Sequence, residues 1–100
     1  MSKLFHRLAT TYTAGIDLRA AYALEEKTGN SKYRLNAKII NRQLGAGKSL
    51  AESMENLNGY FPDLAVSVVK AGERGGRLEE SFTRLSNHYS ALVSFRNKFL

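Results

Sequence analysis

The sequence contains no cysteine and only one proline, Pro62, among its 100 residues. Without cysteine, neither a disulfide framework nor a thiolate metal site can form, and a reducing compartment such as the cytoplasm fits that absence. Few segments alternate strictly between apolar and polar residues, and a single proline leaves long stretches free to be helical. The composition therefore predicts one all-α domain over residues 1–100, large enough to bury a modest core.

Long apolar runs are also missing. No stretch approaches the roughly 20 apolar residues that a membrane-spanning helix needs. Residues 1–12 lack the uninterrupted apolar core of a signal peptide. We therefore expect the chain to be soluble as it stands.

Acidic residues are scarce relative to basic ones. Nine Asp and Glu stand against fifteen Lys and Arg, which gives a net charge of +6. Such a surplus suits a nucleic acid, an anionic membrane surface or an acidic protein partner, and a simply solvated basic surface gives the same count. The basic residues are spread along the chain, and no run of consecutive charges forms a nucleic-acid-binding arm.

Apolar residues at three- and four-residue steps predict six helices. Local signals mark their ends: Asp17 suits an N-cap, Gly29 suits a left-handed stop, and Ser49 with Glu52 forms a capping-box pattern. The expected segments are residues 4–12, 18–28, 31–44, 50–57, 61–72 and 78–92. Short connections predict antiparallel neighbours, and hence a compact antiparallel bundle of about six helices.

The same spacing predicts which side chains face the core. In the third and fifth segments, the expected inward-facing residues are Leu35, Ile39, Ile40, Leu44, Leu64, Ala65, Val68 and Val69. The sixth segment has the cleanest repeat, with apolar residues alternately four and three apart, which predicts a seam in the core or a contact between two copies in a homodimer. This seam comprises Leu78, Phe82, Leu85, Tyr89 and Leu92.

Glu73 stands between Gly72 and the pair Gly75-Gly76, at a predicted corner between two helices. One interpretation is that its carboxylate accepts backbone N–H groups from the start of the sixth helix. Glu73→Ala would then destabilise the domain by about 1–3 kcal/mol. The other interpretation is a ligand to a hard cation such as calcium, completed by a nearby carboxylate or carbonyl, and a single carboxylate is weak support for it.

Other candidate sites have simpler explanations. Gly45 to Ser49 resembles part of a phosphate-binding loop, but Arg42 stands where that motif needs glycine, and a helix rather than a strand leads in. His6 and His88 each lack a second ligand at metal-binding spacing. No nucleophile, base and orienting group lie close together in the sequence, so we expect neither a catalytic site nor a cofactor.

Taken together, these residues resemble a known family, the type II secretion system F domain, over roughly residues 4–89. The most specific match is G-E-x-G-G-x-L at residues 72–78, preceded by Phe61-Pro62 at the expected distance. The positions that follow the family pattern are Gly15, Gly47, Ser49, Phe61, Pro62, Gly72, Glu73, Gly75, Gly76 and Leu78. Two residues differ from the commonest choice in the family: Asp17 stands where proline is frequent, and Gly75, within the motif, stands where a small hydroxyl residue is common.

The resemblance implies a six-helix cytoplasmic domain of an inner-membrane platform protein in type II secretion or type IV pilus biogenesis. Such a protein contains two similar copies of the domain and about three membrane spans, so this chain would be one copy without a span. Its implied role is non-enzymatic: it would bind the assembly ATPase or other inner-membrane components of the machine. The basic and aromatic residues 95–99 suit a position beside the membrane.

The alternative from another class is a basic helical nucleic-acid-binding module. A helix-turn-helix reader needs a short turn before a basic recognition helix. Only residues 31–44 are basic enough, and their flanks lack that arrangement. Binding through phosphate contacts would weaken steeply as salt rises, whereas docking through an apolar protein face would not.

Overall fold

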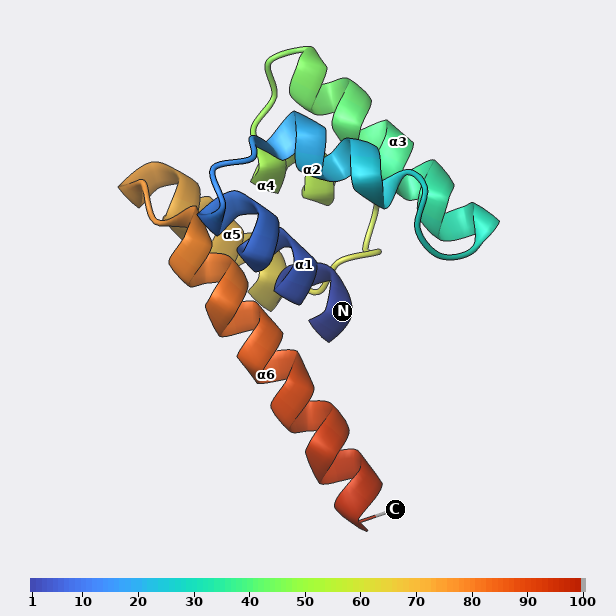
Figure 1. Ribbon diagram of the computed structural model, residues 1–100, viewed down its shortest axis with the longest axis vertical. Helices are drawn as coiled ribbons and strands as arrows, with labels where there is room; N and C mark the ends of the chain where they lie inside the picture. Colours follow the sequence, from blue (N-terminus) through green and yellow to red (C-terminus); the bar gives the residue numbers. More distant parts are fainter. Residues whose placement is uncertain (100) are drawn as a thin grey trace.

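Six α-helices joined by short loops make up residues 1–99, which are the residues that the computed structural model describes (Figure 1). The helices are α1 (Ser2–Thr13), α2 (Leu18–Glu25), α3 (Ser31–Gly45), α4 (Leu50–Glu55), α5 (Asp63–Gly75) and α6 (Leu78–Phe99). Residues 1–99 contain no strand. The predicted all-α class with about six helices is confirmed.

Side-chain caps explain where several helices begin. The Asp17 carboxylate accepts a hydrogen bond from Ala20 N at 2.8 Å at the start of α2, as predicted. The Asn30 amide oxygen accepts from Tyr33 N at 2.9 Å at the start of α3. Each bond satisfies one of the backbone N–H groups that have no partner in the first turn of a helix.

Several helix boundaries differ from the predicted ones, most of all that of α6, which continues to Phe99 instead of ending at residue 92. The second helix ends at Glu25 rather than at residue 28, because the N–H groups of Lys27 and Thr28 bond three residues back, which tightens the last turn. The fifth helix begins after Pro62, which occupies the N-cap position, and continues past Gly72 to Gly75. Glu73 therefore lies inside α5 rather than in the corner that follows it.

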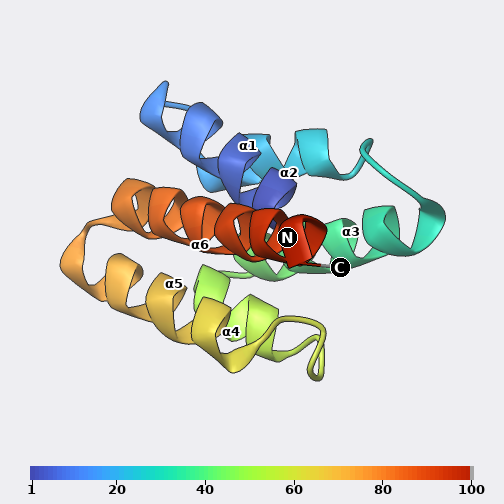
Figure 2. The same ribbon diagram turned by 90° about the horizontal axis from the view of Figure 1, so that it is seen from below.

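Each helix packs against its neighbours in the sequence, and α1 closes the ring by packing along α6. Viewed from below, α6 lies between α1 and α5 (Figure 2). Both of these helices run antiparallel to α6 (Figure 1). On the far side, α3 contacts α2 and α4. This closed arrangement brings the first and last helices together although they are far apart in the sequence.

Aromatic side chains fill the contact between α1 and α6. The ring of Phe5 stacks on Phe82 and on Tyr89, with centroids 6.4 and 6.1 Å apart. The ring of Tyr12 meets Phe82 edge-on at 5.9 Å. Phe5 and Phe82 are fully buried, so the apolar stripes predicted for the first and sixth helices do meet in the core.

Two leucines that were predicted to face the core, Leu35 and Leu64, are exposed instead, and so is Leu92, which was predicted to lie in the core or in a contact between two copies. Leu35 is 57% exposed, Leu64 is 47% exposed and Leu92 is 51% exposed. On α3 the buried residues begin at Ala37, and α5 buries Ala65 and Val66, so Leu35 and Leu64 lie off the buried stripe of each helix. Leu92 lies outside the core because no other helix of the described chain covers α6 beyond Tyr89, and its contact with a second copy stays a prediction.

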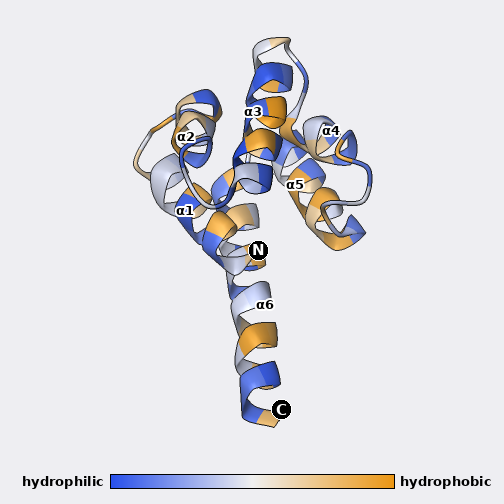
Figure 3. Cartoon of the chain, turned by 90° about the vertical axis from the view of Figure 1, so that its right-hand side faces the viewer, coloured by the Kyte–Doolittle hydropathy of each residue, from blue (hydrophilic) through white to orange (hydrophobic). Residues whose placement is uncertain are grey.

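The last part of α6 extends well beyond the other helices (Figures 1 and 3). Every residue from Ser90 to Phe99 is exposed. This extension contributes to the long axis of the molecule, whose principal extents are 43, 32 and 26 Å. None of the helices within residues 1–99 combines the length and the apolar character that crossing a bilayer takes.

Candidate functional site

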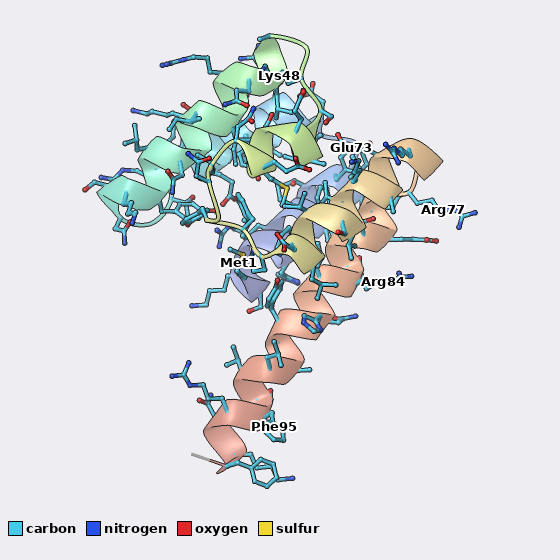
Figure 4. All side chains as sticks on the ribbon, turned by 180° about the vertical axis from the view of Figure 1, so that it is seen from behind. Met1, Lys48, Glu73, Arg77, Arg84 and Phe95 are labelled. Atoms are coloured by element: carbon cyan, nitrogen blue, oxygen red, sulfur yellow. The ribbon has the colours of Figure 1, made fainter. Side chains whose placement is uncertain are left out.

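Glu73 joins α5 to the start of α4 (Figure 4). Its two carboxylate oxygens accept from Leu50 N at 2.7 Å and from Ala51 N at 2.9 Å. The Ser49 hydroxyl accepts from the next N–H, that of Glu52, at 3.1 Å. These three N–H groups begin the helix and have no partner within it, so Ser49 and Glu73 together satisfy the whole first turn of α4.

The prediction that Glu73 binds the start of the sixth helix is therefore wrong about the partner, although the type of contact is right. Glu73 was placed at the corner before α6, but it lies within α5, and its side chain points across to α4. The two residues it binds are 22 and 23 positions away in the sequence. Packing of α5 on α4 brings them together, and no local signal indicates that packing.

Gly72 allows α5 and α6 to approach closely. A Cβ atom at this position would lie 2.0 Å from the hydroxyl oxygen of Ser81, far inside van der Waals contact. That hydroxyl donates to Val68 O at 3.1 Å or to Arg77 O at 3.2 Å. Glycine is thus required at position 72 by the space available beside α6 rather than by an unusual backbone angle.

The corner itself is made by Gly76 and Arg77. Gly76 has φ +68°, a left-handed conformation that favours glycine. Arg77 N then donates to Gly72 O at 2.8 Å, which closes the end of α5, and Leu78 enters the core at once. By contrast, a Cβ atom at Gly75 would meet only the Arg77 side chain, at 4.0 Å, so the packing does not require glycine there.

The arrangement around Glu73 favours capping over metal binding. Both of its carboxylate oxygens already accept N–H groups, and the nearby groove is also lined by the basic residues Lys70 and Arg74. Within residues 1–99, no three side chains of His, Cys, Asp or Glu are close enough together to hold a metal ion. The residues from Gly45 to Ser49 end α3 and cap α4, which is the simpler of the two explanations for that segment.

The other residues of the sequence pattern have structural roles in other parts of the fold. Phe61 is buried in the core, and Gly15 and Gly47 both have positive φ in the loops after α1 and α3. Of the predicted seam, Leu78, Phe82 and Leu85 are buried, Tyr89 is half-buried, and Leu92 is exposed. The structure thus brings Ser49 close to the segment that contains Gly72, Glu73, Gly75, Gly76 and Leu78, and leaves Gly15 and Phe61 in other parts of the fold.

A second carboxylate cluster, centred on Glu25, was not recognised in the sequence. Glu25 is only 3% exposed. Its carboxylate accepts two hydrogen bonds from the Arg7 guanidinium, both at 2.8 Å, and a third from the Tyr33 hydroxyl at 2.6 Å. This cluster joins α1, α2 and α3. The available signal was the position of Glu25, three residues after Tyr22 and four after Ala21, on the buried face of α2.

Burial and the neighbouring carboxylate change the acidity of this cluster. Burial, followed by the hydrogen bond to Glu25, raises the pKa of the Tyr33 hydroxyl above its ordinary value. The hydrogen bond to Glu25 raises the pKa of the Arg7 guanidinium, so that side chain stays charged. The cluster is therefore an ion pair with a neutral tyrosine at neutral pH, which suits a structural contact.

The outer surface between α5 and α6 forms a groove of about 390 Å³. Val68, Ala71 and Gly72 line it from α5. Arg77 and Arg84 line the other side, together with Glu80, and both arginine side chains point away from the bundle (Figure 4). The groove is open to solvent and lies over the close contact between Gly72 and Ser81. Apolar residues on one side and two arginines on the other can hold a protein segment with acidic and apolar residues.

Comparison with known protein families matches residues 4–100 to the family described as "Type II secretion system (T2SS), protein F". This match covers nearly the whole chain. It confirms the resemblance inferred from the G-E-x-G-G-x-L segment and from Phe61-Pro62.

Several curated proteins are also similar to this chain. A "Type IV pilus assembly protein PilC" from Thermus thermophilus is 32% identical over 93 residues, which are 92% of this chain and 23% of the relative. A "Type II secretion system protein F" from Aeromonas hydrophila is 29% identical over 101 residues, or 100% of this chain and 26% of the relative. A "Type IV pilus assembly protein TapC" from the same species is 28% identical, covering 93% of the chain and 22% of the relative. The chain thus spans about a quarter of the length of these relatives.

Proposed function

The chain belongs to the type II secretion system protein F family, and we propose that it is a docking domain of a longer platform protein in the inner membrane. The observation that carries the proposal is the family match over residues 4–100. Relatives named for type II secretion and for type IV pilus assembly are similarly close to the chain. The proposal therefore covers both kinds of machine, and in it the domain faces the cytoplasm.

The proposed mechanism is binding without covalent chemistry. A domain that passes motion from a cytoplasmic ATPase to a membrane platform has to be rigid between its contact surfaces. The two carboxylate clusters and the close approach at Gly72 support that rigidity, because they join α1 to α3 and α4 to α6 through buried contacts. The partner in this proposal is the assembly ATPase of the machine.

We assign this contact to the groove between α5 and α6. Arg77 and Arg84 would attract acidic side chains of the partner, and Val68 with Ala71 would contact its apolar residues. The groove is built on the helices that Glu73 and Gly72 hold in place, so its shape does not depend on a flexible loop. Such a mixed surface is typical of protein interfaces, which combine an apolar centre with a polar rim.

The test is to titrate the purified chain with the purified assembly ATPase from the same machine and to measure the Kd. Reversing both groove charges, Arg77→Glu with Arg84→Glu, is expected to weaken binding by about tenfold or more. The matched control reverses two exposed lysines of α3, Lys32→Glu with Lys38→Glu, and should change the Kd little. Equal loss in both variants would show that net charge, not the groove, determines binding.

The same titration separates docking from nucleic-acid binding. Duplex DNA replaces the ATPase, and the salt concentration is varied. A chain that binds DNA with an affinity that falls steeply with salt, and does not bind the ATPase at all, would contradict the docking role. Binding to the ATPase that persists at moderate salt would support it.

A further inference from the structure

Residues 27–51 carry the whole net charge of the chain. Basic residues occur throughout the sequence, but this segment contains six of the fifteen and none of the nine acidic residues. The residues outside it carry nine of each and are neutral overall. Most of the segment is helix α3, and its basic residues are Lys27, Lys32, Arg34, Lys38, Arg42 and Lys48. A surplus of charge on one helix favours contact with an anionic partner.

The side of α3 that faces solvent combines cations with apolar side chains. With about 100° between successive residues of a helix, five residues lie within an arc of roughly 120°: Lys32, Leu35, Lys38, Ile39 and Arg42. We call this surface the outer face of α3. The side chains that α3 buries lie on the opposite side: Ala37, Ile40 and Asn41. Leu35, at the centre of the outer face, is 57% exposed, the three cations are exposed, and Ile39 is half-buried.

The neighbouring helices bind the flanks of α3 and leave its outer face uncovered. On the side of α2, the Asn41 amide donates to the Glu26 carboxylate at 2.7 Å. On the side of α4, the Asn56 amide donates to the side-chain oxygen of Gln43 at 2.9 Å. None of the three cations of the outer face forms an ion pair with any of residues 1–99. The outer face is thus a basic surface with an apolar centre that the contacts within the bundle do not use.

The outer face of α3 is separate from the groove assigned to the assembly ATPase. That groove lies between α5 and α6, whereas α3 packs against α2 and α4. In Figures 1 and 3, α3 lies at the opposite end of the molecule from the last turns of α6. The two surfaces can therefore be occupied by different partners.

We propose that the outer face of α3 binds an acidic amphipathic helix of a second protein, other than the assembly ATPase. Leu35 and Ile39 are one helical turn apart, and they pack against apolar residues one turn apart on the partner. Carboxylates on either side of that apolar row pair with the three cations. The apolar centre supplies affinity, and the charges select an acidic partner and its orientation. Because the surface is separate from the groove, this contact does not rest on the docking role proposed above.

A nucleic acid fits the same face less well. Its phosphates would pair with the cations, but a sugar-phosphate backbone has no apolar row against which Leu35 and Ile39 can pack. Bases could not stack there either, because the outer face contains no aromatic residue. The aromatic residue of α3 is Tyr33, and its hydroxyl donates to Glu25 at 2.6 Å. A protein helix that carries both carboxylates and apolar side chains satisfies the cations and the leucine at once.

The experiment is an NMR titration of the isotope-labelled 100-residue chain with two synthetic helical peptides. The first is built from Glu, Ala and Leu, with leucines one turn apart along one side and glutamates beside them. The second has serine in place of each leucine, so it keeps the charge without the apolar row. We expect the first peptide to shift the amide signals of α3, with a Kd of about 100 µM that rises with salt. The second should bind at least about fivefold more weakly.

Two changes on the outer face test its assignment. Leu35→Ser is expected to weaken binding of the first peptide by about fivefold, because the apolar centre is lost. Lys32→Gln with Lys38→Gln is expected to weaken it by about fivefold or more. The matched controls are Leu64→Ser, which changes another exposed leucine, and Arg77→Gln with Arg84→Gln, which removes two charges from the groove. Both controls should change the Kd little.

Each other outcome would overturn the proposal. Absence of binding by the first peptide at about 1 mM would refute it directly. Equal binding of the two peptides, or equal losses in the outer-face and control variants, would mean that charge alone determines binding. Duplex DNA that binds more tightly than the first peptide, and shifts the same amide signals, would make the outer face a nucleic-acid surface. Self-association of the chain that Leu35→Ser abolishes would make it a contact between two copies. Circular dichroism of every variant shows whether the bundle has stayed folded.

Discussion

Two glutamates hold this domain together in different ways. Glu73 accepts hydrogen bonds from two backbone N–H groups of α4, whereas Glu25 accepts from two side chains, Arg7 and Tyr33. Glu73 is half-buried, and Glu25 is almost fully buried. Backbone donors keep their places whichever side chains surround them, so the contact of Glu73 depends on one residue. The contact of Glu25 depends on three residues, each from a different helix.

The difference also explains why the sequence indicates a role for only one of them. Glu73 stands among glycines in a short and specific segment. Glu25 stands in an ordinary helical stretch, and its partners are 18 and 8 residues away. A residue that serves the fold through scattered side chains leaves little local trace.

The largest effect is expected from Glu25→Ala. The free energy of unfolding should fall by about 3 kcal/mol, because the Tyr33 hydroxyl and the Arg7 guanidinium lose their shared acceptor. This loss of free energy is at the lower end of the range for breaking a buried ion pair, because the Arg7 side chain is 37% exposed and water can hydrate it. Urea unfolding followed by circular dichroism measures it, with exposed Glu55→Ala as the control. A loss below about 1 kcal/mol would mean that the buried cluster contributes little.

Gly72→Ala is expected to cost about 2–3 kcal/mol, because the new Cβ atom would overlap the Ser81 hydroxyl at the contact between α5 and α6. The measurement is the same unfolding experiment, repeated in a Ser81→Ala background, where the closest overlap is absent. The cost of Gly72→Ala should be smaller there. Purely additive effects would contradict the role assigned to this contact. Gly75→Ala, where the structure leaves space, is the matched control.

Glu73→Ala is expected to cost about 1–2 kcal/mol, less than Glu25→Ala, because it removes hydrogen bonds to two backbone N–H groups but leaves no charged side chain without its acceptor. Hydrogen exchange of the amides of Leu50 and Ala51 should accelerate more than that of the amides in α1. Glu52→Ala is the control, because it changes a residue of α4 but leaves the capping carboxylate of Glu73 in place. If the melting temperature of Glu73→Ala is unchanged, the capping role is wrong.

The smallest effect is expected in the pH dependence of stability. Burial raises the pKa of the Tyr33 hydroxyl in the folded protein. The unfolded chain therefore loses this proton first, so stability is fully present below a pH of about 10 and falls as pH rises above it. Tyr33→Phe should make that fall shallower and cost about 1 kcal/mol at neutral pH. If the stability of Tyr33→Phe falls with pH as steeply as that of the wild type, the Tyr33 hydroxyl is not the cause of the fall. Burial also raises the pKa of Tyr22, so Tyr22→Phe serves as the comparison.

Much of the local structure was predictable because its causes lie within a few residues. The caps at Asp17 and Ser49 bond N–H groups three residues ahead, and the stripe of Leu4, Phe5 and Leu8 follows from helical spacing. The family was likewise recognisable from a short segment, residues 72–78, read together with Phe61-Pro62. These features required no knowledge of how the helices pack.

Other features depend on which helices meet. Leu35 and Leu92 have the spacing of core residues, yet both are exposed. Leu35 is exposed because α2 and α4 cover a different side of α3. Leu92 is exposed because no other helix of the described chain covers α6 beyond Tyr89. The partner of Glu73 follows from the packing of α5 on α4, and the need for glycine at position 72 follows from the distance between α5 and α6.

The amino-acid sequence alone established the helical class, the places where helices begin and the family, because short-range hydrogen bonds and helical periodicity are properties of neighbouring residues. The three-dimensional arrangement established which carboxylate binds which helix, which leucines are buried, and how far α6 extends beyond the bundle. Those outcomes depend on contacts between residues far apart in the chain, since burial is a property of a surface that several helices form together.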